Sequence, residues 1–168
     1  MRFYCIKQHD ITDCGAACLA TICKQNGYKI GITKIREVAG TDKQGTNVYG
    51  LIKAAEQLGF SAKGVKGNKE AFFSDFPLPC IAHVIVEGNL LHYVVIHKIT
   101  KKQVIIADPG VGIVKLTPEG FFGEVHEEGK APKYQWSGVL ILLVKNETFK
   151  KDDETKGLFS RFFHLLLP

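Results

Sequence analysis

The apolar pattern of this chain changes period near residue 80, and this change limits the folds that the chain can adopt. Before that point, apolar residues recur at helical spacing in segments that stop at Asn26-Gly27 and at Gly59. After it, runs rich in β-branched residues follow one another, with turn signals between them. Helices first and strands afterwards predict an α+β fold, in which an N-terminal helical half packs on a C-terminal antiparallel β-sheet.

The first half predicts several helices. The clearest covers residues 12–27, with Thr12 or Asp13 as its cap, and is small or apolar almost all round, as in a buried helix. Shorter helices are expected after Thr33, from Asn47 to Gly59, and from residue 68.

The second half predicts a series of strands. They cover residues 81–86, 91–99, 103–107, 113–116 and 136–144, and a short helix is expected from Thr117. We expect Gly88-Asn89 to form a two-residue hairpin turn. That turn pairs His92 with Ile85 and places His83 and His92 on one face of the sheet.

Composition narrows the class of protein. The chain has 168 residues, of which 45% are hydrophobic and 23% charged, as in one globular domain. Its net charge of +5 comes from lysines scattered along the chain, which does not favour nucleic-acid binding. The N-terminus lacks a secretory signal, so the five cysteines are expected to be reduced thiols. No apolar run reaches the ~20 residues of a membrane helix, which predicts a soluble domain.

A change of composition near residue 145 predicts a domain boundary. Residues 1–145 have the pattern of a folded domain, and residues 146–168 form a charged linker followed by an apolar tail. The tail is too short to span a bilayer and is typical of an interfacial helix or of the start of a further segment.

Cys14 is the candidate nucleophile. It falls in the first turn of a predicted helix, where backbone N–H groups and the helix dipole favour a thiolate. Gly15 and the two alanines after it leave room for a peptide backbone. The alternative is that Cys14 is a buried cysteine like Cys18 and Cys23. A zinc site is a weaker alternative, because cysteines at this spacing on one helix match zinc poorly; we expect no metal.

Gln8 is the candidate oxyanion donor. It lies six residues before Cys14, in an extended segment that can fold back over the start of the helix. Its side-chain NH₂ group and the Cys14 backbone N–H are suited to hold the oxyanion of a tetrahedral intermediate. The alternative for Gln8 is a solvated surface side chain.

A thiolate nucleophile needs a base, and the histidines of the predicted sheet are the candidates. His92 lies among apolar residues, which is a costly position for an imidazole without a role, although His83 shares its predicted face and stays an open alternative. Asp108, at the end of a strand, is the candidate partner of the base. A three-residue loop at 100–102 would place Asp108 opposite Val94, on the His92 face, whereas a two-residue loop would turn it away.

The segment from Gln8 to Leu19, QHDITDCGAACL, resembles the signature of the bacteriocin-processing peptidase domains of peptidase-containing ABC transporters, which are papain-like. Matching segments follow in order at 45–47, 58–60, 91–95 and 107–110, so that the resemblance covers about residues 3–144. It implies Cys14 as nucleophile, His92 rather than His83 as base, Asp108 as its orienting partner and Gln8 as oxyanion donor.

This resemblance implies a cysteine endopeptidase that removes a leader peptide after a Gly-Gly or Gly-Ala pair, coupled to export. Its partners would be a precursor with an amphipathic helical leader and the transmembrane and nucleotide-binding domains of a transporter. It would act on the cytoplasmic side of the bacterial plasma membrane, without a cofactor of its own, since ATP is used at the separate nucleotide-binding domain. Alternatives are a non-catalytic leader-binding module and a thiol amidase or transglutaminase of the same fold.

Leader-binding residues are harder to predict than catalytic ones. The aromatic residues Tyr49, Phe60, Phe72 and Phe73 are apolar enough to line a groove, but residues of this kind are more often part of the core.

Overall fold

The computed structural model describes residues 1–40, 46–146 and 163–165, and it has the mixed helical and antiparallel architecture that the sequence predicts. The helical elements are η1 (Ile11–Asp13, a 3₁₀ turn), α1 (Cys14–Gln25), α2 (Ile32–Ala39), α3 (Val48–Gln57), α4 (Lys69–Phe72) and α5 (Pro118–Phe122). The strands are β1 (Phe60–Gly67), β2 (Cys80–Val86), β3 (Leu90–Ile99), β4 (Val104–Asp108), β5 (Gly112–Leu116), β6 (Tyr134–Lys145) and β7 (Phe163–Leu165).

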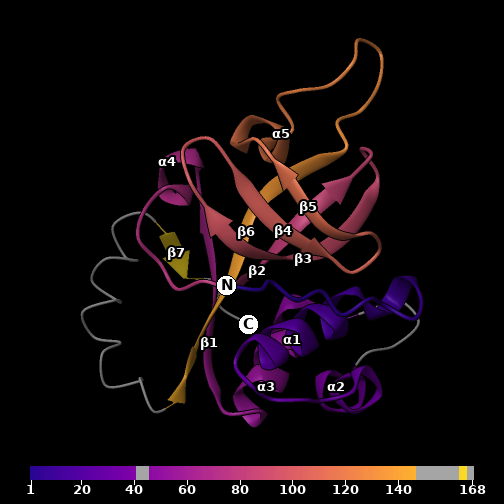
Figure 1. Ribbon diagram of the computed structural model, residues 1–168, viewed down its shortest axis with the longest axis vertical. Helices are drawn as coiled ribbons and strands as arrows, with labels where there is room; N and C mark the ends of the chain where they lie inside the picture. Colours follow the sequence, from indigo (N-terminus) through magenta and orange to yellow (C-terminus); the bar gives the residue numbers. More distant parts are fainter. Residues whose placement is uncertain (41–45, 147–162, 166–168) are drawn as a thin grey trace.

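The strands form one antiparallel sheet in the order β5-β4-β3-β2-β6-β1-β7. Helices α1, α2 and α3 lie against one side of this sheet, and α4 and α5 lie on the other (Figure 1). Among the described residues, no helix has the length and apolarity needed to cross a bilayer.

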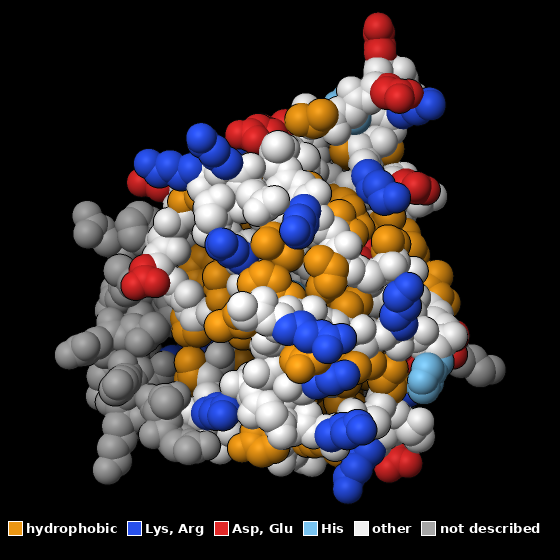
Figure 2. All heavy atoms as spheres, in the orientation of Figure 1, with side chains coloured by type: hydrophobic (Ala, Val, Ile, Leu, Met, Phe, Trp, Pro, Cys, Tyr) orange, Lys and Arg blue, Asp and Glu red, His pale blue; other side chains and the backbone are white. Residues whose placement is uncertain are grey.

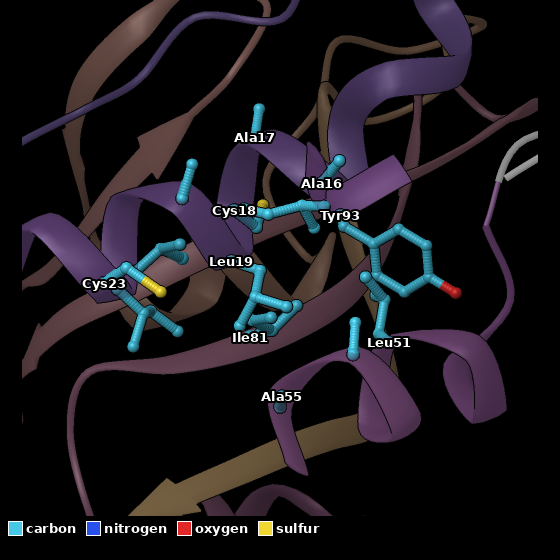
Figure 3. Close-up of a cluster of buried hydrophobic side chains, with 14 of the residues drawn as sticks. Ala16, Ala17, Cys18, Leu19, Cys23, Leu51, Ala55, Ile81 and Tyr93 are labelled. Carbon is cyan, nitrogen blue, oxygen red and sulfur yellow. The ribbon is translucent and has the colours of Figure 1, made fainter. Parts of the chain in front are cut away.

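Two hydrophobic clusters fill the layers on either side of the sheet. The first surrounds α1 and joins buried residues such as Cys18 and Leu19 to Leu51 of α3 and Tyr93 of β3 (Figure 3). The second is built on Phe72, which packs against Phe121 and Trp136 at ring-centroid distances of 5.5 and 5.1 Å. Helix α1 is therefore fixed against the sheet by an almost wholly apolar surface, as its sequence predicts.

The predicted helix ends are largely confirmed, but the start of the first helix is not capped as expected. Asp10 accepts a hydrogen bond from the Thr12 N–H at 2.8 Å and so caps the 3₁₀ turn, whereas Asp13 makes no side-chain cap of α1. At the other end, Asn26 and the left-handed Gly27 terminate α1 as predicted.

Strand β1 was not predicted from the sequence. Its residues include Ser61, Lys63 and two glycines, and they lack the β-branched run of the other strands. The strand is stabilised by its neighbour, because Phe60 to Lys66 pair residue by residue with the apolar strand β6. Long-range pairing here outweighs a weak local preference.

The predicted hairpin register between β2 and β3 is wrong by one residue. Glu87 and Gly88 both have positive φ, and the Asn89 N–H closes the turn on the Val86 carbonyl, so the turn begins one residue earlier than expected. His92 consequently pairs with Val84 and not with Ile85, while His83 pairs with Tyr93. His83 and His92 therefore project from opposite faces of the sheet.

The connection from β3 to β4 also differs from the prediction. Ile99 pairs with Val104 across a four-residue loop, a register that by itself would turn Asp108 away from His92. A bulge at His97 then shifts the pairing by one residue, so that Val95 faces Ala107 and Asp108 comes opposite Val94. The predicted loop is wrong, and the bulge produces the shared face that the loop was expected to provide.

Charged side chains lie over the surface without forming a single stripe. Figure 2 shows lysines and arginines spread over one face, with apolar patches between them and acidic groups mainly at its edges. The predicted boundary at residue 145 stays a prediction, because most of the linker and tail (147–162 and 166–168) lies outside the described residues.

Candidate active site

Cys14 is the first residue of α1 and is 8% exposed. The first turn of a helix carries backbone N–H groups without intrahelical partners, and such groups favour an anion. A Cβ on the next residue, Gly15, would lie 3.1 Å from the Leu51 side chain, so a small residue allows α1 and α3 to approach closely. The thiol is thus held at a rigid helix start.

The residue before Cys14 is a buried aspartate that pairs with a partly exposed arginine. The Asp13 side chain is 1% exposed and accepts a hydrogen bond from the Arg36 guanidinium of α2, and it also accepts the Asp10 backbone N–H at 3.2 Å. This pair links α2 to the turn that leads into α1, and so it fixes the backbone just before the thiol.

His92 lies between Asp108 and Cys14. Its Nε2 atom is 2.7 Å from Oδ1 of Asp108, and both side chains are buried. The Cys14 thiol lies close enough to the same imidazole to raise its pKa, and because Nε2 is taken by Asp108, Nδ1 is the ring nitrogen left for the sulfur. A thiol, an imidazole and a carboxylate therefore form a chain of contacts, the geometry of a cysteine nucleophile with an oriented base.

The Asp108 carboxylate is fully engaged. Oδ1 also accepts the Gly110 N–H at 2.8 Å, and Oδ2 accepts the Tyr134 hydroxyl at 2.5 Å. Sequence reasoning did not identify Tyr134. It lies 26 residues after Asp108, two residues before the strand predicted from 136, and no local pattern marks a tyrosine there.

These contacts set the charge of the pair. Burial is the largest single influence on the pKa of His92 and lowers it, but the hydrogen bond that His92 donates to Asp108, the interaction with Cys14 and the charges of both outweigh burial and raise the pKa to about 9. Burial likewise acts to raise the pKa of Asp108, and the hydrogen bonds of His92, Tyr134 and the Gly110 N–H outweigh it, so the pKa lies below its ordinary value. An imidazolium facing a carboxylate results.

Gln8 lies in the N-terminal segment that runs back past the end of β4. Its backbone N–H donates to the Pro109 carbonyl at 2.9 Å, and its Nε2 atom lies 3.9 Å from the position of a Cβ on Gly110. The side-chain amide makes no hydrogen bond to the described residues, and Oε1 is buried without a partner. The structure thus brings Gln8 next to the Asp108–Gly110 turn with its amide unengaged, and its role as oxyanion donor stays a prediction.

The other sheet histidines have structural partners. His83 Nδ1 lies 2.9 Å from Ser137 Oγ, and His97 donates from Nε2 to the Tyr4 carbonyl at 2.8 Å and stacks on Phe3. Neither contacts the Asp108 carboxylate, so the chain of contacts contains His92 and not His83.

The remaining cysteines are buried or half-buried thiols. Burial raises the pKa values of Cys18, Cys23 and Cys80, which keeps them protonated and unreactive. In the part of the chain that the structure describes, no group of three or more histidine, cysteine or acidic side chains is arranged so that it could hold a metal ion.

The chain is similar to known proteins over most of its length. Residues 2–148 match the peptidase C39 family. The lactococcin-G-processing and transport ATP-binding protein LagD of Lactococcus lactis subsp. lactis is 38% identical over 163 residues, which is 96% of this chain and 22% of LagD. The chain therefore spans about a fifth of the length of this curated relative.

Two solved structures share the fold. The crystal structure of the peptidase domain of Streptococcus ComA, described as a bi-functional ABC transporter involved in a quorum sensing pathway, has a TM-score of 0.74 at 33% identity, covering 86% of this chain and 99% of that one. A double glycine motif protease from an AMS/PCAT transporter, in complex with the leader peptide, has a TM-score of 0.71 at 26% identity, covering 86% and 92%. Both are similar over nearly the whole described domain.

Proposed function

Because this chain belongs to the peptidase C39 family, we propose that it is a cysteine endopeptidase that removes the leader peptide from secreted-peptide precursors by cutting after a Gly-Gly or Gly-Ala pair. The observation that carries the proposal is the buried His92–Asp108 pair in contact with Cys14 at the start of α1. The similarity to a double glycine protease bound to its leader peptide supports the choice of substrate.

The proposed reaction follows from the groups at the site. The Cys14 thiolate attacks the carbonyl of the second small residue, and the oxyanion is held by backbone N–H and the Gln8 amide. The His92 imidazolium then donates its proton to the leaving amine, and Asp108 keeps the ring oriented. Water hydrolyses the resulting thioester, with His92 as base. Every step uses side chains of this domain, so we propose that cleavage needs no cofactor or metal.

We propose that the leader binds on the side of the sheet that faces α1. The cross-strand pairs His83–Tyr93 and Ile85–Leu91 project from that face, and Tyr93 belongs to the same buried cluster as Cys14. Leu91 is 66% exposed, and Tyr49, at the start of α3, is 57% exposed. An amphipathic helix could cover such apolar side chains.

The aromatic residues that the sequence suggested for this role separate into two groups. Phe60 and Phe72 are buried core residues, whereas Tyr49 and Phe73 are exposed.

If the leader binds on the face next to α1, Leu91→Ala and Tyr49→Ala should raise KM for the leader peptide several-fold with little change in kcat. Val125→Ala is the matched control, because it removes an exposed apolar side chain from the distant loop before β6.

The setting of the domain is also part of the proposal. Its relatives are processing and transport proteins about five times its length, so we propose that residues 1–145 act as the peptidase part of an ABC transporter, with 146–168 leading toward its transmembrane domain. A nucleotide-binding domain elsewhere in such a protein would use ATP. The peptidase would then meet precursors on the cytoplasmic side of the membrane.

Mass spectrometry of a synthetic leader ending in Gly-Gly with a short cargo tests the proposal. We expect cleavage after the second glycine by the parent and by Cys23→Ala, a control that removes a buried thiol at the far end of α1, but not by Cys14→Ala. If no protein cleaves the peptide but all bind it, the domain is a leader-binding module. Cleavage by Cys14→Ala would exclude Cys14 as the nucleophile.

A further inference from the structure

We infer that Tyr134 is a positioning residue of this site: its hydroxyl holds the Asp108 carboxylate in the orientation that His92 requires. The inference rests on the proposed function, because it assigns a part in that reaction to a residue outside the chain of contacts from Cys14 to Asp108. Tyr134 itself is 3% exposed and does not face the solvent from which a peptide would arrive.

The hydrogen bonds of Asp108 support this role. A carboxylate can rotate about its Cβ–Cγ bond, and a single contact to His92 would leave that rotation open. Here Oδ1 is shared by His92 and the Gly110 N–H, at 2.7 and 2.8 Å, while Oδ2 is held by Tyr134 at 2.5 Å. The two donors to Oδ1 fix one end of the group, and Tyr134 alone fixes the other.

The contact from Tyr134 to Asp108 joins strands that are not neighbours. Asp108 ends β4 and Tyr134 begins β6, and β3 and β2 lie between them in the sheet. Three strand spacings amount to roughly 14 Å across a flat sheet, which is beyond the reach of the two side chains. The hydrogen bond therefore requires the sheet to curl toward the face from which His92 and Asp108 project. The curl brings the start of β6 to the end of β4, and Tyr134 joins these two strands at the Asp108 carboxylate.

The groups around the carboxylate give Tyr134 a defined charge state. Burial and the Asp108 charge both raise the pKa of Tyr134, so the phenol stays protonated and donates. The other titratable groups that face the pair are His92 of β3, Cys5 of the N-terminal segment and, through His92, Cys14 of α1 and His83 of β2. Among these groups, only Tyr134 and His92 donate to the Asp108 side chain. The Cys5 thiol donates instead to the backbone carbonyl of Asp108, at 3.4 Å.

Tyr134→Phe removes the hydroxyl and keeps the ring. For the leader peptide we expect kcat to fall about tenfold with KM nearly unchanged, because one hydrogen bond to a charged group is lost far from the bound peptide. We also expect the acidic limb of the pH profile to move to higher pH, since the Asp108 carboxylate loses a donor that stabilises its charge. Tyr28→Phe is the control, because its hydroxyl makes no hydrogen bond to the described residues.

A double-mutant cycle separates positioning from general packing. In an Asp108→Asn background we expect Tyr134→Phe to change kcat by less than about twofold, because the charged acceptor is already absent. An equal loss in both backgrounds, or an unchanged kcat and acidic limb in a folded Tyr134→Phe protein, would overturn the inference.

The test does not depend on the proposed substrate. The rate at which iodoacetamide alkylates Cys14 reports the same acidic limb without any cleavage, so failure to cut a leader peptide leaves this measurement intact. If Tyr134→Phe does not fold, replacement of tyrosine by 3-fluorotyrosine supplies a more acidic hydroxyl. The four other tyrosine hydroxyls make no hydrogen bond to the described residues. The acidic limb of the pH profile for Cys14 alkylation should then move to lower pH. An acidic limb that stays in place would contradict the role of Tyr134.

Discussion

His92 and Asp108 lie 16 residues apart in the chain, and their side chains meet at 2.7 Å because β3 carries a bulge at His97. Without the bulge, the four-residue loop between β3 and β4 would pair Asp108 with Val95 and turn its carboxylate to the opposite face. The bulged residue is itself held, since His97 donates to the Tyr4 carbonyl and stacks on Phe3. The N-terminal segment thereby stabilises the register that forms the site.

The charge of His92 predicts how activity depends on pH. Its pKa is raised to about 9 from 6.5, so the stabilisation that the imidazolium gives is fully present below pH 6.5 and is lost as the pH rises through about 9. We expect peptidase activity to fall over the same alkaline range. Asp108→Asn removes the charge that helps to raise this pKa, and it should move the alkaline limb of the kcat/KM profile to lower pH. An alkaline limb that stays in place would show that Asp108 does not control the His92 charge.

Substitution of Gln8 should lower kcat and leave binding of the leader peptide nearly unchanged. If its amide donates to the oxyanion, Gln8→Ala should lower kcat by roughly 10²–10³ while KM for the leader peptide stays nearly constant. Gln8→Glu should be at least as harmful, because a carboxylate repels the developing anion. Steady-state kinetics on both variants checks this, with Gln57→Ala as an exposed control at the end of α3. A change confined to KM would assign Gln8 to peptide binding.

The ion pair of Arg36 and Asp13 predicts a loss of stability. Arg36→Ala removes the cation that pairs with the buried Asp13 carboxylate, which keeps the Asp10 N–H as a donor, and the free energy of unfolding should fall by roughly 1–3 kcal/mol. The control is Lys130→Ala, which breaks the exposed pair with Glu127 and should have no measurable effect. Urea unfolding compares the variants. Equal stability of both would mean that Asp13 is stabilised by its backbone contacts alone.

A side chain at Gly50 should disturb the contact between α2 and α3. A Cβ at this position would lie 2.5 Å from the Ala39 carbonyl oxygen, so Gly50→Ala must displace backbone. We expect a loss of roughly 1–3 kcal/mol in the free energy of unfolding, although alanine is the better helix former. Lys53→Ala, at an exposed position of the same helix, should be neutral in thermal unfolding. A stabilised Gly50→Ala would show that the two helices separate without cost.

Local sequence patterns were enough to predict most of the secondary-structure elements and the residues with reactive groups. The C-terminal end of α1, the Asn47 cap of α3 and five of the strands follow from short-range patterns of apolar spacing, caps and turn residues. The segment around Cys14, with His92 and Asp108 downstream, pointed to the residues that the structure brings into contact. Each of these signals is contained within a few neighbouring residues.

How those residues meet depends on long-range contacts in the folded chain. The pairing that stabilises β1 joins it to β6, the bulged His97 contacts the Tyr4 carbonyl, and the shifted β2–β3 turn donates from the Glu87 N–H to the Lys133 carbonyl, so each involves a segment distant in the chain. Tyr134 reaches Asp108 only because the sheet curls across four strands. Curvature and bulges arise from packing against both hydrophobic layers at once, and a pattern of period two or 3.6 carries no information about them.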